Sequence, residues 1–411
     1  MWGSRLEKYH FLSSNSLQEG HWNNLNPAKP YYLFRPAAAP VALNDAYRDF
    51  TSVTSIFPTR STGVQTSRDK LVIGFSEQEI RARLDNFVDT STDDEFFRRT
   101  YFREHRTGRH LRGDTRGWNL SEVRQWVRDN LAELQRSILR IEYRPFDTRY
   151  VIYHPKMVDW PRHEVMHHLD DENVALLVPR QLSAEGFRHS FCANLPSEMC
   201  VISTKTKEQN YVSPLWLRLD SEENNTQVEN FSTDFRMFLD TRYDHHYAAE
   251  EIFGYIYAVL HASTYRARYA EFLRIDFPRV PFPEGADDFE ILSGLGWALV
   301  QAHLLRELPR RGLAAYHGRG DHDVEAVRYA PAEQAVAINK TQDFKPVPQA
   351  VWDFHIGGYR VLDKYLKSRR GRVLSLDEIN HVGAIADSLA FTIDQMAKID
   401  EAYKAAFRDA A

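Results

Sequence analysis

The sequence predicts an α+β protein that combines a β-rich body of mixed strands with a helical spacer or scaffold and C-terminal helices. Three observations carry this prediction. Short β-branched and aromatic runs lie between 138 and 240, a strongly helical pattern occupies 247–274, and an amphipathic helical pattern begins near 375. Strands and helices that are grouped rather than alternating are typical of this fold class. The 411 residues are enough for two or three domains with ample core.

The first part of the chain combines loops with short regular elements. Residues 1–50 are rich in proline and aromatic side chains, which favours extended segments because proline lacks a backbone N–H group. The run LVIGF at 71–75 predicts a short strand, and residues 76–87 predict a helix that Ser76 and Glu79 cap. A second helix is predicted from 119 to 136, because its apolar residues recur on one face.

The middle of the chain carries the predicted strands, which are ILRIEYR, RYVIYH, NVALLVPR, MCVISTK and SPLWLRL. Helices are predicted at 247–274 and 286–308. Between them, three prolines in nine residues force extended backbone. Short strands and turns are expected at 316–340, and one or two helices from about 375 onward.

The composition excludes several classes of protein. Lys and Arg total 52 and Asp and Glu total 57, and the net charge of -5 argues against a surface that binds nucleic acid all over. The two cysteines, Cys192 and Cys200, exclude a disulfide framework and favour a reducing compartment. Neither a signal peptide nor an apolar run of membrane-spanning length is evident. We therefore expect a soluble cytoplasmic protein with no membrane partner.

The five-residue pattern H-E-x-x-H occurs at 163–167. On a helix this spacing places His163 and His167 on one face, where they can bind zinc while Glu164 acts as a general base. The segment is short, however, and no third ligand follows at a recognisable spacing. The sequence therefore favours an ordinary surface turn here, and a zinc-dependent hydrolase remains the alternative from another functional class.

Signatures of bound cofactors are missing from the sequence. It contains no phosphate-binding P-loop, no G-x-G-x-x-G fingerprint and no G-x-S-x-G nucleophile elbow. The tetrapeptide with which amino-methylating enzymes hold a flipped base, Asn or Asp followed by Pro-Pro-Tyr, is also absent. We expect no cofactor in this chain and no catalytic residue of its own.

Four basic patches remain, at 59–70, 98–116, 203–210 and 357–372. The second and the fourth each carry an excess of five positive charges. Arg, Lys, Asn and Gln can read base edges, and Ser, Thr and Gly can hold phosphates. Solvated faces and internal ion pairs are the competing interpretation of each patch. Negative charge must then gather elsewhere, as at 220–234 and 284–290.

Several long blocks resemble the C-terminal specificity region of Type ISP restriction–modification enzymes and related adenine-N6 DNA methyltransferases. The clearest is FGYIYAVLHASTYRARYAEFLRIDFPRVPFP at 253–283. Similar blocks are YRPFDTRYVIY at 143–153, residues 162–169, VWDFHIGGYRVLDKYLKSR at 351–369, SLDEINH at 375–381 and STGVQTSRDK at 61–70. The resemblance covers the chain from about residue 9 to 400. In this family the first position of the H-E-x-x-H block is usually not histidine, so the resemblance implies that His163 is incidental.

The resemblance implies a module that recognises a specific double-stranded DNA sequence. A separate adenine methyltransferase domain, in cis or in trans, would flip the target adenine and supply S-adenosylmethionine. Helicase-like and nuclease domains are further partners of the family, whose restriction activity serves phage defence. A non-DNA structural docking domain is the remaining alternative. We expect DNA contacts from ten residues, which are Arg60, Gln65, Arg68, Lys70, Arg149, Lys205, Lys207, Lys364, Arg369 and Arg370.

An internal ion pair with Asp147 or Glu142 is an equally good interpretation of Arg149. The arginines of 98–116 and the basic residues from Lys364 to Arg372 are expected at phosphates. The predicted segments are a β-rich recognition body at 1–244, a helical spacer at 245–310, strands and a basic loop at 311–374, and C-terminal helices at 375–411. We expect 311–374 to return to the recognition body, because its strands have no other sheet to join.

Overall fold

The computed structural model describes residues 4–15, 41–103, 110–115, 117–183, 186–219 and 226–408. The chain divides into two compact units, Met1–Ala46 and Tyr47–Ala411. Helices α1 (Arg5–Ser14) and α2 (Val41–Asp49) replace the loops expected at the two ends of 1–50. Ser4 and Glu7 form a capping box at the start of α1, which explains why a helix begins there. Most of the proline-rich stretch lies outside the described residues.

The second unit begins with short elements that frame a loop. They are β1 (Thr51–Ser52), α3 (Val53–Ile56), β2 (Ser61–Thr62), α4 (Asp69–Val72) and β3 (Ile73–Gly74). The strand expected at 71–75 is therefore only partly correct, since its first two residues complete the turn of α4. The helix expected at 76–87 is confirmed as α5 (Glu77–Val88), and the Ser76 hydroxyl accepts the Glu79 N–H at 3.1 Å.

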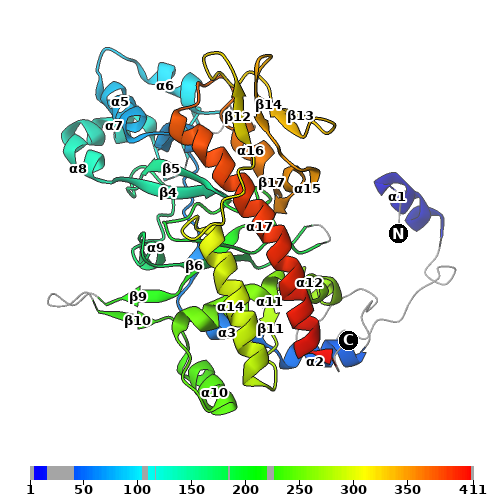
Figure 1. The fold of residues 1–411 in the computed structure, drawn as a ribbon. Coiled ribbons are helices and arrows are strands. Elements are labelled where there is room, and N and C mark those ends of the chain that lie inside the picture. Colours follow the sequence, from blue (N-terminus) through cyan, green and yellow to red (C-terminus); the bar gives the residue numbers. More distant parts are fainter. Residues whose placement is uncertain are drawn as a thin grey trace. The chain divides into compact units, whose positions relative to one another are not determined.

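Helices α6 (Asp94–Tyr101), α7 (Leu120–Asp129) and α8 (Leu131–Arg136) follow α5. The helix expected from 119 to 136 is thus two helices, because the backbone leaves helical geometry at Asn130. Figure 1 shows α5, α7 and α8 beside the hairpin of β4 (Ile138–Arg144) and β5 (Asp147–Ile152). Together with β3, these two strands form a three-stranded sheet in the order β3-β5-β4.

A four-stranded antiparallel sheet lies next in the chain, in the order β2-β8-β6-β7. Its later strands are β6 (Ala175–Pro179), β7 (Phe191–Ala193) and β8 (Asn210–Pro214). The strand expected from MCVISTK is wrong. Side chains capture its backbone N–H groups instead, since Glu198 accepts from Cys200 at 2.8 Å and Ser203 accepts from Lys205 at 3.2 Å. Short helices α9 (His163–Met166) and η1 (Thr206–Glu208) and the hairpin of β9 (Trp216–Arg218) and β10 (Gln227–Glu229) complete this part.

Helices α11 (Ala249–His261), α14 (Ala286–His303) and α17 (Leu376–Ala406) pack along one another (Figure 1). Glycines allow the close approach, because a side chain on Gly296 would overlap the Gly254 carbonyl oxygen. The C-terminal region is one helix of 31 residues. Around this layer lie α10 (Thr233–Tyr243), α12 (Ser263–Arg268), α13 (Ala270–Leu273) and β11 (Arg279–Val280), which pairs with β1. The expected helix break at 275–283 is confirmed.

Strands β12 (Ala315–Gly318), β13 (Arg328–Ala330), β14 (Ala335–Ala337) and β15 (Gln342–Lys345) form a sheet of their own. The reason given for expecting 311–374 to join the earlier strands is therefore wrong. The segment nevertheless packs against them, because Val336 and Phe344 belong to one hydrophobic core with Val64 and Ile141. It continues through α15 (Gln349–Trp352), β16 (His355–Ile356), β17 (Tyr359–Arg360) and α16 (Val361–Lys367). The four-part division of the chain remains a prediction.

Candidate nucleic-acid interface

The loop between β2 and α4, residues 63–68, is anchored at both ends. Gly63 lies so close to the Glu198 backbone that a Cβ atom would come within 2.6 Å of its carbonyl oxygen. The Val64 side chain is fully buried, and its N–H donates to the Ser197 carbonyl at 2.8 Å. Beyond this anchor Gln65 is half-buried and Ser67 is exposed. The loop is thus a rigid support that presents polar side chains at its tip.

The buried side chain of Arg68 holds this loop against residues 157–159. Its side chain is 2% exposed and donates to Asp159 at 2.6 Å and to the Met157 carbonyl at 3.3 Å. The guanidinium also lies over the Trp118 ring, 4.2 Å from its centroid. Burial lowers the pKa of Arg68, and the charge of Asp159 opposes that shift. Arg68 therefore ties the loop to residues 157–159 from inside the fold.

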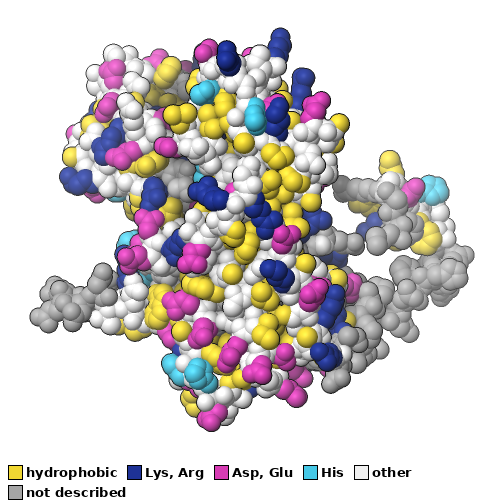
Figure 2. Space-filling model, viewed as in Figure 1, with side chains coloured by type: hydrophobic (Ala, Val, Ile, Leu, Met, Phe, Trp, Pro, Cys, Tyr) yellow, Lys and Arg dark blue, Asp and Glu magenta, His cyan; other side chains and the backbone are white. Residues whose placement is uncertain are grey.

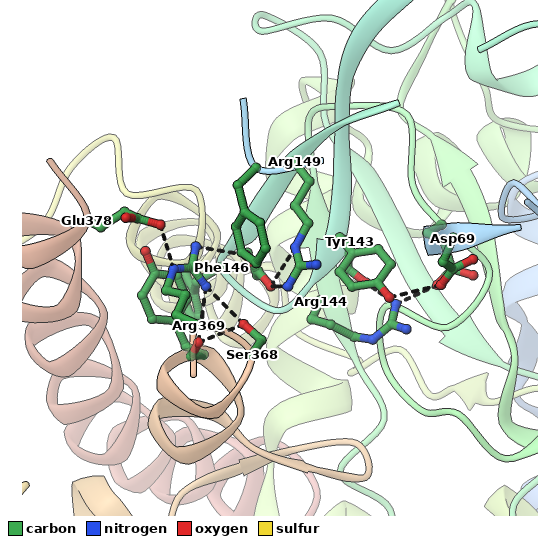
Figure 3. A network of polar contacts seen from close by, with 12 residues as sticks. Asp69, Tyr143, Arg144, Phe146, Arg149, Ser368, Arg369 and Glu378 are labelled. Atoms are coloured by element: carbon green, nitrogen blue, oxygen red, sulfur yellow. Dashed lines mark hydrogen bonds and ion pairs between the residues drawn. The ribbon is translucent and has the colours of Figure 1, made fainter. Parts of the chain in front are cut away.

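A wall of stacked side chains continues from this loop (Figure 3). The Tyr143 hydroxyl donates to Asp69 at 2.9 Å. Arg149 lies between two rings, 4.2 Å from the Tyr143 centroid and 4.1 Å from that of Phe75, and donates to Asp147 at 2.8 Å. The internal ion pair weighed for Arg149 is therefore present, with Asp147 as its partner.

Asp147 also receives Arg369, whose side chain is 4% exposed. Arg369 donates to Glu378 at 2.8 Å (Figure 3). It also donates to Asp147 at 3.0 Å and lies over the Tyr365 ring. Burial alone would raise the pKa of Asp147, but Arg149 and Arg369 hold it below its ordinary value. One buried carboxylate therefore joins the β4–β5 hairpin to the segment that follows α16.

Lys70 lies where two adjoining hollows meet. Tyr143 and Arg149 line the first hollow, which has a volume of about 320 Å³. Arg103 lines the second, of about 470 Å³. Both include Asp69, Lys70 and Tyr101. Lys70 and Arg103 are exposed, and neither makes an ion pair within the described ranges. We call the two hollows together the Lys70 groove.

Residues 55–396 match the Type ISP C-terminal specificity domain. The chain belongs to this family.

Solved structures similar to this specificity domain show the same fold at low sequence identity. A nuclease-deletion mutant of the Type ISP restriction-modification enzyme LlaGI, in complex with a DNA substrate mimic, aligns with a TM-score of 0.63 and 17% identity over 97% of this chain and 32% of that chain. The DrdV–DNA complex aligns with a TM-score of 0.67 and 17% identity over 96% and 42%.

The ATP-dependent Type ISP enzyme LlaBIII bound to DNA gives a TM-score of 0.62 and 15% identity over 86% of this chain and 24% of that chain. This specificity domain therefore spans less than half the length of these chains. No curated protein matches its sequence.

The arginine-rich segment of the specificity domain is partly internal. Arg98 is buried and forms a two-pronged pair with Asp114 at 2.8 and 3.1 Å, and Arg99 pairs with Glu95 one helical turn away at 2.6 Å. Arg103 alone of these three reaches the Lys70 groove. Arg106, Arg109 and Arg116 lie outside the described residues.

The remaining candidates lie in separate places. Arg60 donates to three backbone carbonyls, the nearest being that of Phe57 at 2.9 Å. Lys205 and Lys207 are exposed around η1, where Lys205 approaches Glu208 at 3.4 Å. Burial alone would raise the pKa of Glu208, but hydrogen bonds, above all that from Ser203, lower it to about 2. The structure does not bring these residues to the Lys70 groove.

Lys364 and Arg370 lie on and just after α16. Lys364 is half-buried with its ammonium 5.5 Å from the Tyr359 ring, and burial together with Arg144 and Arg149 lowers its pKa. Arg370 is exposed and lines a shallow hollow with Lys367 and Asp323. Of the ten candidates, Arg68, Lys70 and Arg149 line the Lys70 groove.

Sequence reasoning missed the pair of Arg144 and Glu198, which stand 2.6 Å apart in the interior beneath the loop. Burial alone would lower the pKa of Arg144, but the negative charge of Glu198 raises it above its ordinary value. The order of residues gave no signal for this pair, because its partners are separated by 54 positions. Trp160 was also missed as a surface feature, although a tryptophan between Asp159 and Pro161 cannot continue an apolar strand or helix face.

The first four residues of the H-E-x-x-H pattern form one helical turn, α9, and His167 is its C-cap. The rings of His163 and His167 lie 5.2 Å apart, and His167 Nδ1 contacts the His163 carbonyl at 2.6 Å. Across the described part of the chain, no group of three His, Cys, Asp or Glu side chains is arranged to hold a metal ion. The hydrolase alternative therefore has no support. No helix among the described residues is both long enough and apolar enough to cross a membrane.

Proposed function

We propose that this specificity domain recognises a specific sequence in double-stranded DNA. The observation that carries the proposal is the family match over residues 55–396. It is supported by relatives of the same fold that were solved with DNA. The Lys70 groove also supports it. Its exposed cations suit contacts with phosphates, and the polar loop beside it suits contacts with bases.

The distribution of charge supports the same proposal. Figure 2 shows acidic side chains gathered over α10 and the neighbouring end of α14. Asp287 and Asp288 lie in the first turn of α14, and Asp234 in that of α10. The cations of the Lys70 groove belong to other elements. A net charge of -5 is thus compatible with DNA binding, because steering depends on where the charges lie.

Four arginines that bond to other groups of the chain have a supporting role in this proposal. Arg60, Arg68, Arg149 and Arg369 hold the loops, while Gln65, Lys70, Lys205, Lys207, Lys364 and Arg370 remain proposed DNA contacts. A methyltransferase domain, which binds S-adenosylmethionine, acts on the adenine that the specificity domain selects. Helicase and nuclease parts belong to the same system of phage defence, which acts on DNA in the cytoplasm.

Selection from random duplexes tests this function. The chain is incubated with a pool of random duplexes at moderate salt, and the bound fraction is sequenced. We expect one short asymmetric motif to be enriched. Lys70→Ala should weaken binding to every duplex in the pool, whereas Lys340→Ala, an exposed lysine outside the groove, should not. A bound pool without an enriched motif would contradict sequence reading and favour a docking domain.

A further inference from the structure

A large aromatic side chain stands exposed beside the loop that carries Gln65. The Trp160 side chain is 54% exposed, although Val158 and Val165 on either side of it are buried. Its indole N–H makes no hydrogen bond with any described residue. Exposed tryptophan on a soluble surface costs solvation, and it recurs where a partner covers the ring.

The position of Trp160 is fixed by the backbone. The Gln65 N–H donates to the Trp160 carbonyl at 3.0 Å, and the Trp160 N–H donates back to the Gln65 carbonyl at 3.1 Å. Below this pair, Arg68 and Asp159 are joined at 2.6 Å. The Tyr153 hydroxyl holds the Pro161 carbonyl at 2.7 Å on the far side. Trp160 and Gln65 thus form one stiff edge, although they are far apart in the sequence.

Arg162 completes this edge. Its guanidinium lies 5.1 Å from the centroid of the Trp160 ring and makes no ion pair among the described residues. Its backbone is left-handed, with φ 56° and ψ 41°, a conformation that is unfavourable for a residue with a side chain. Strain of this kind persists where the surrounding structure imposes it, and it is concentrated at functional sites.

The polar group of Gln65 is only lightly engaged. The amide nitrogen donates to Ser67 at 3.2 Å in an exposed bond. Its remaining donor and its oxygen are therefore available, and together they match the N6 and N7 atoms of adenine in the major groove. A guanidinium matches O6 and N7 of guanine, and an aromatic face packs against a thymine methyl group.

We infer that Gln65, Trp160 and Arg162 form a base-reading edge, in which Gln65 selects adenine, Arg162 selects guanine and Trp160 covers the neighbouring pyrimidine. This inference rests on the proposed function and gives it a site. It separates the roles of two adjoining surfaces. The edge reads bases, whereas the Lys70 groove contacts phosphates. Arg68 is a positioning residue, because its buried side chain joins the two segments of the edge through Asp159 without reaching the surface.

Three variants test the edge on the same random duplex pool. Gln65→Ala should lose preference at one position of the enriched motif and leave the others unchanged. Trp160→Ala and Arg162→Ala should each relax a position next to it. Affinity for the enriched duplex should fall between about 5-fold and 100-fold in each variant, as expected for loss of one good base contact. Affinity for a duplex of unrelated sequence should not change.

Controls separate this inference from folding and from the proposed function. Met237→Ala removes another exposed apolar side chain, 63% exposed on α10, and should leave both motif and affinity unchanged. Each variant should melt at the wild-type temperature. If the wild type enriches a motif and all three edge variants enrich that same motif with equal affinity, the edge does not read bases, although the function stands. If the wild type enriches nothing, the function itself fails.

A uniform result would also overturn the inference. Equal weakening of Trp160→Ala on every duplex would make the edge a non-specific contact. Unchanged DNA selectivity with loss of binding to the methyltransferase part would make it a protein docking surface. A rescue series supports the aromatic role, because Trp160→Phe should keep more of the preference than Trp160→Ala.

Discussion

The cationic side chains of the described residues divide into two kinds according to what surrounds them. Arg68, Arg98 and Arg369 have side chains that are 2 to 5% exposed, and each meets a carboxylate. Lys70 and Arg103 are exposed beside a hollow surface. Removal of one partner from a buried pair leaves an uncompensated charge in the interior, whereas removal of an exposed cation leaves no unpaired charge in the interior. Cationic side chains therefore stabilise the fold where they are buried, and we propose that they contact DNA where they are exposed.

Substitution at Arg68 should therefore affect folding more than DNA contacts. We expect Arg68→Ala to lower the free energy of unfolding by about 3 kcal/mol, because Asp159 loses its partner and the loop loses its support. Lys70→Ala should change that free energy by less than about 0.5 kcal/mol. Urea unfolding measures both. An Arg68→Ala protein as stable as the wild type would show that Arg68 is not the support described.

At the scale of elements, the contact between α11 and α14 depends on glycine. Gly296 faces the Gly254 carbonyl, while Gly294 on the same helix is exposed, and a Cβ atom added there would have no neighbour within 4 Å. Gly296→Ala should destabilise the protein by about 1 to 3 kcal/mol, because the helices must move apart. Gly294→Ala should stabilise it by up to about 1 kcal/mol, because alanine is the better helix former. Thermal unfolding of the two variants compares them directly.

The same helix layer should respond to acid. His303 on α14 is enclosed between the Tyr257 hydroxyl at 2.5 Å and the Thr392 hydroxyl at 2.9 Å, and burial followed by Arg266 lowers its pKa to about 3. In the unfolded chain the His303 imidazole takes up a proton near pH 6.5, whereas in the folded state it stays neutral until the pH falls much lower. Stability should therefore fall as the pH drops below 6.5, by up to about 1.4 kcal/mol per pH unit.

Urea unfolding at pH 7 and pH 5 measures this effect. His303→Gln should reduce the loss of stability between the two values, because glutamine keeps polar atoms but does not titrate. His261, whose pKa burial also lowers, remains in the variant and leaves a residual slope. An identical pH dependence in wild type and variant would contradict the assignment to His303.

For the whole molecule, DNA binding by a chain of net charge -5 should be strongly dependent on salt. Each phosphate contact releases counterions, so the logarithm of the affinity falls with the logarithm of the salt concentration by about 0.9 per contact. Lys70→Ala should reduce the magnitude of that slope by about one, whereas Gln65→Ala should leave it unchanged. Binding titrations between about 50 and 200 mM salt measure the slopes. Equal slopes for Lys70→Ala and wild type would remove Lys70 from the phosphate contacts.

The sequence allowed the fold class, the family and most long elements to be predicted. Periodicity was sufficient for α5, α14 and strand β4, and it found β5 with bounds shifted by two residues, because each element depends on its own residues. It failed at 199–205, where Glu198 and Ser203 compete for backbone groups. Charge counting found the basic segments but could not separate buried from exposed arginines. That distinction depends on partners such as Asp147 for Arg369, 222 residues away.

The paired backbone of Gln65 and Trp160 has a consequence for exchanging specificities between family members. The two segments, near 65 and near 160, are far apart in the sequence but are joined in the fold. Backbone hydrogen bonds connect Gln65 with Trp160, and an ion pair connects Arg68 with Asp159. A graft that replaces only one of the two segments would pair a new backbone with the old one, and an incoming segment without Arg68 or Asp159 would lose the ion pair. Segments 61–70 and 157–163 should therefore be transplanted together, as a single two-piece cassette.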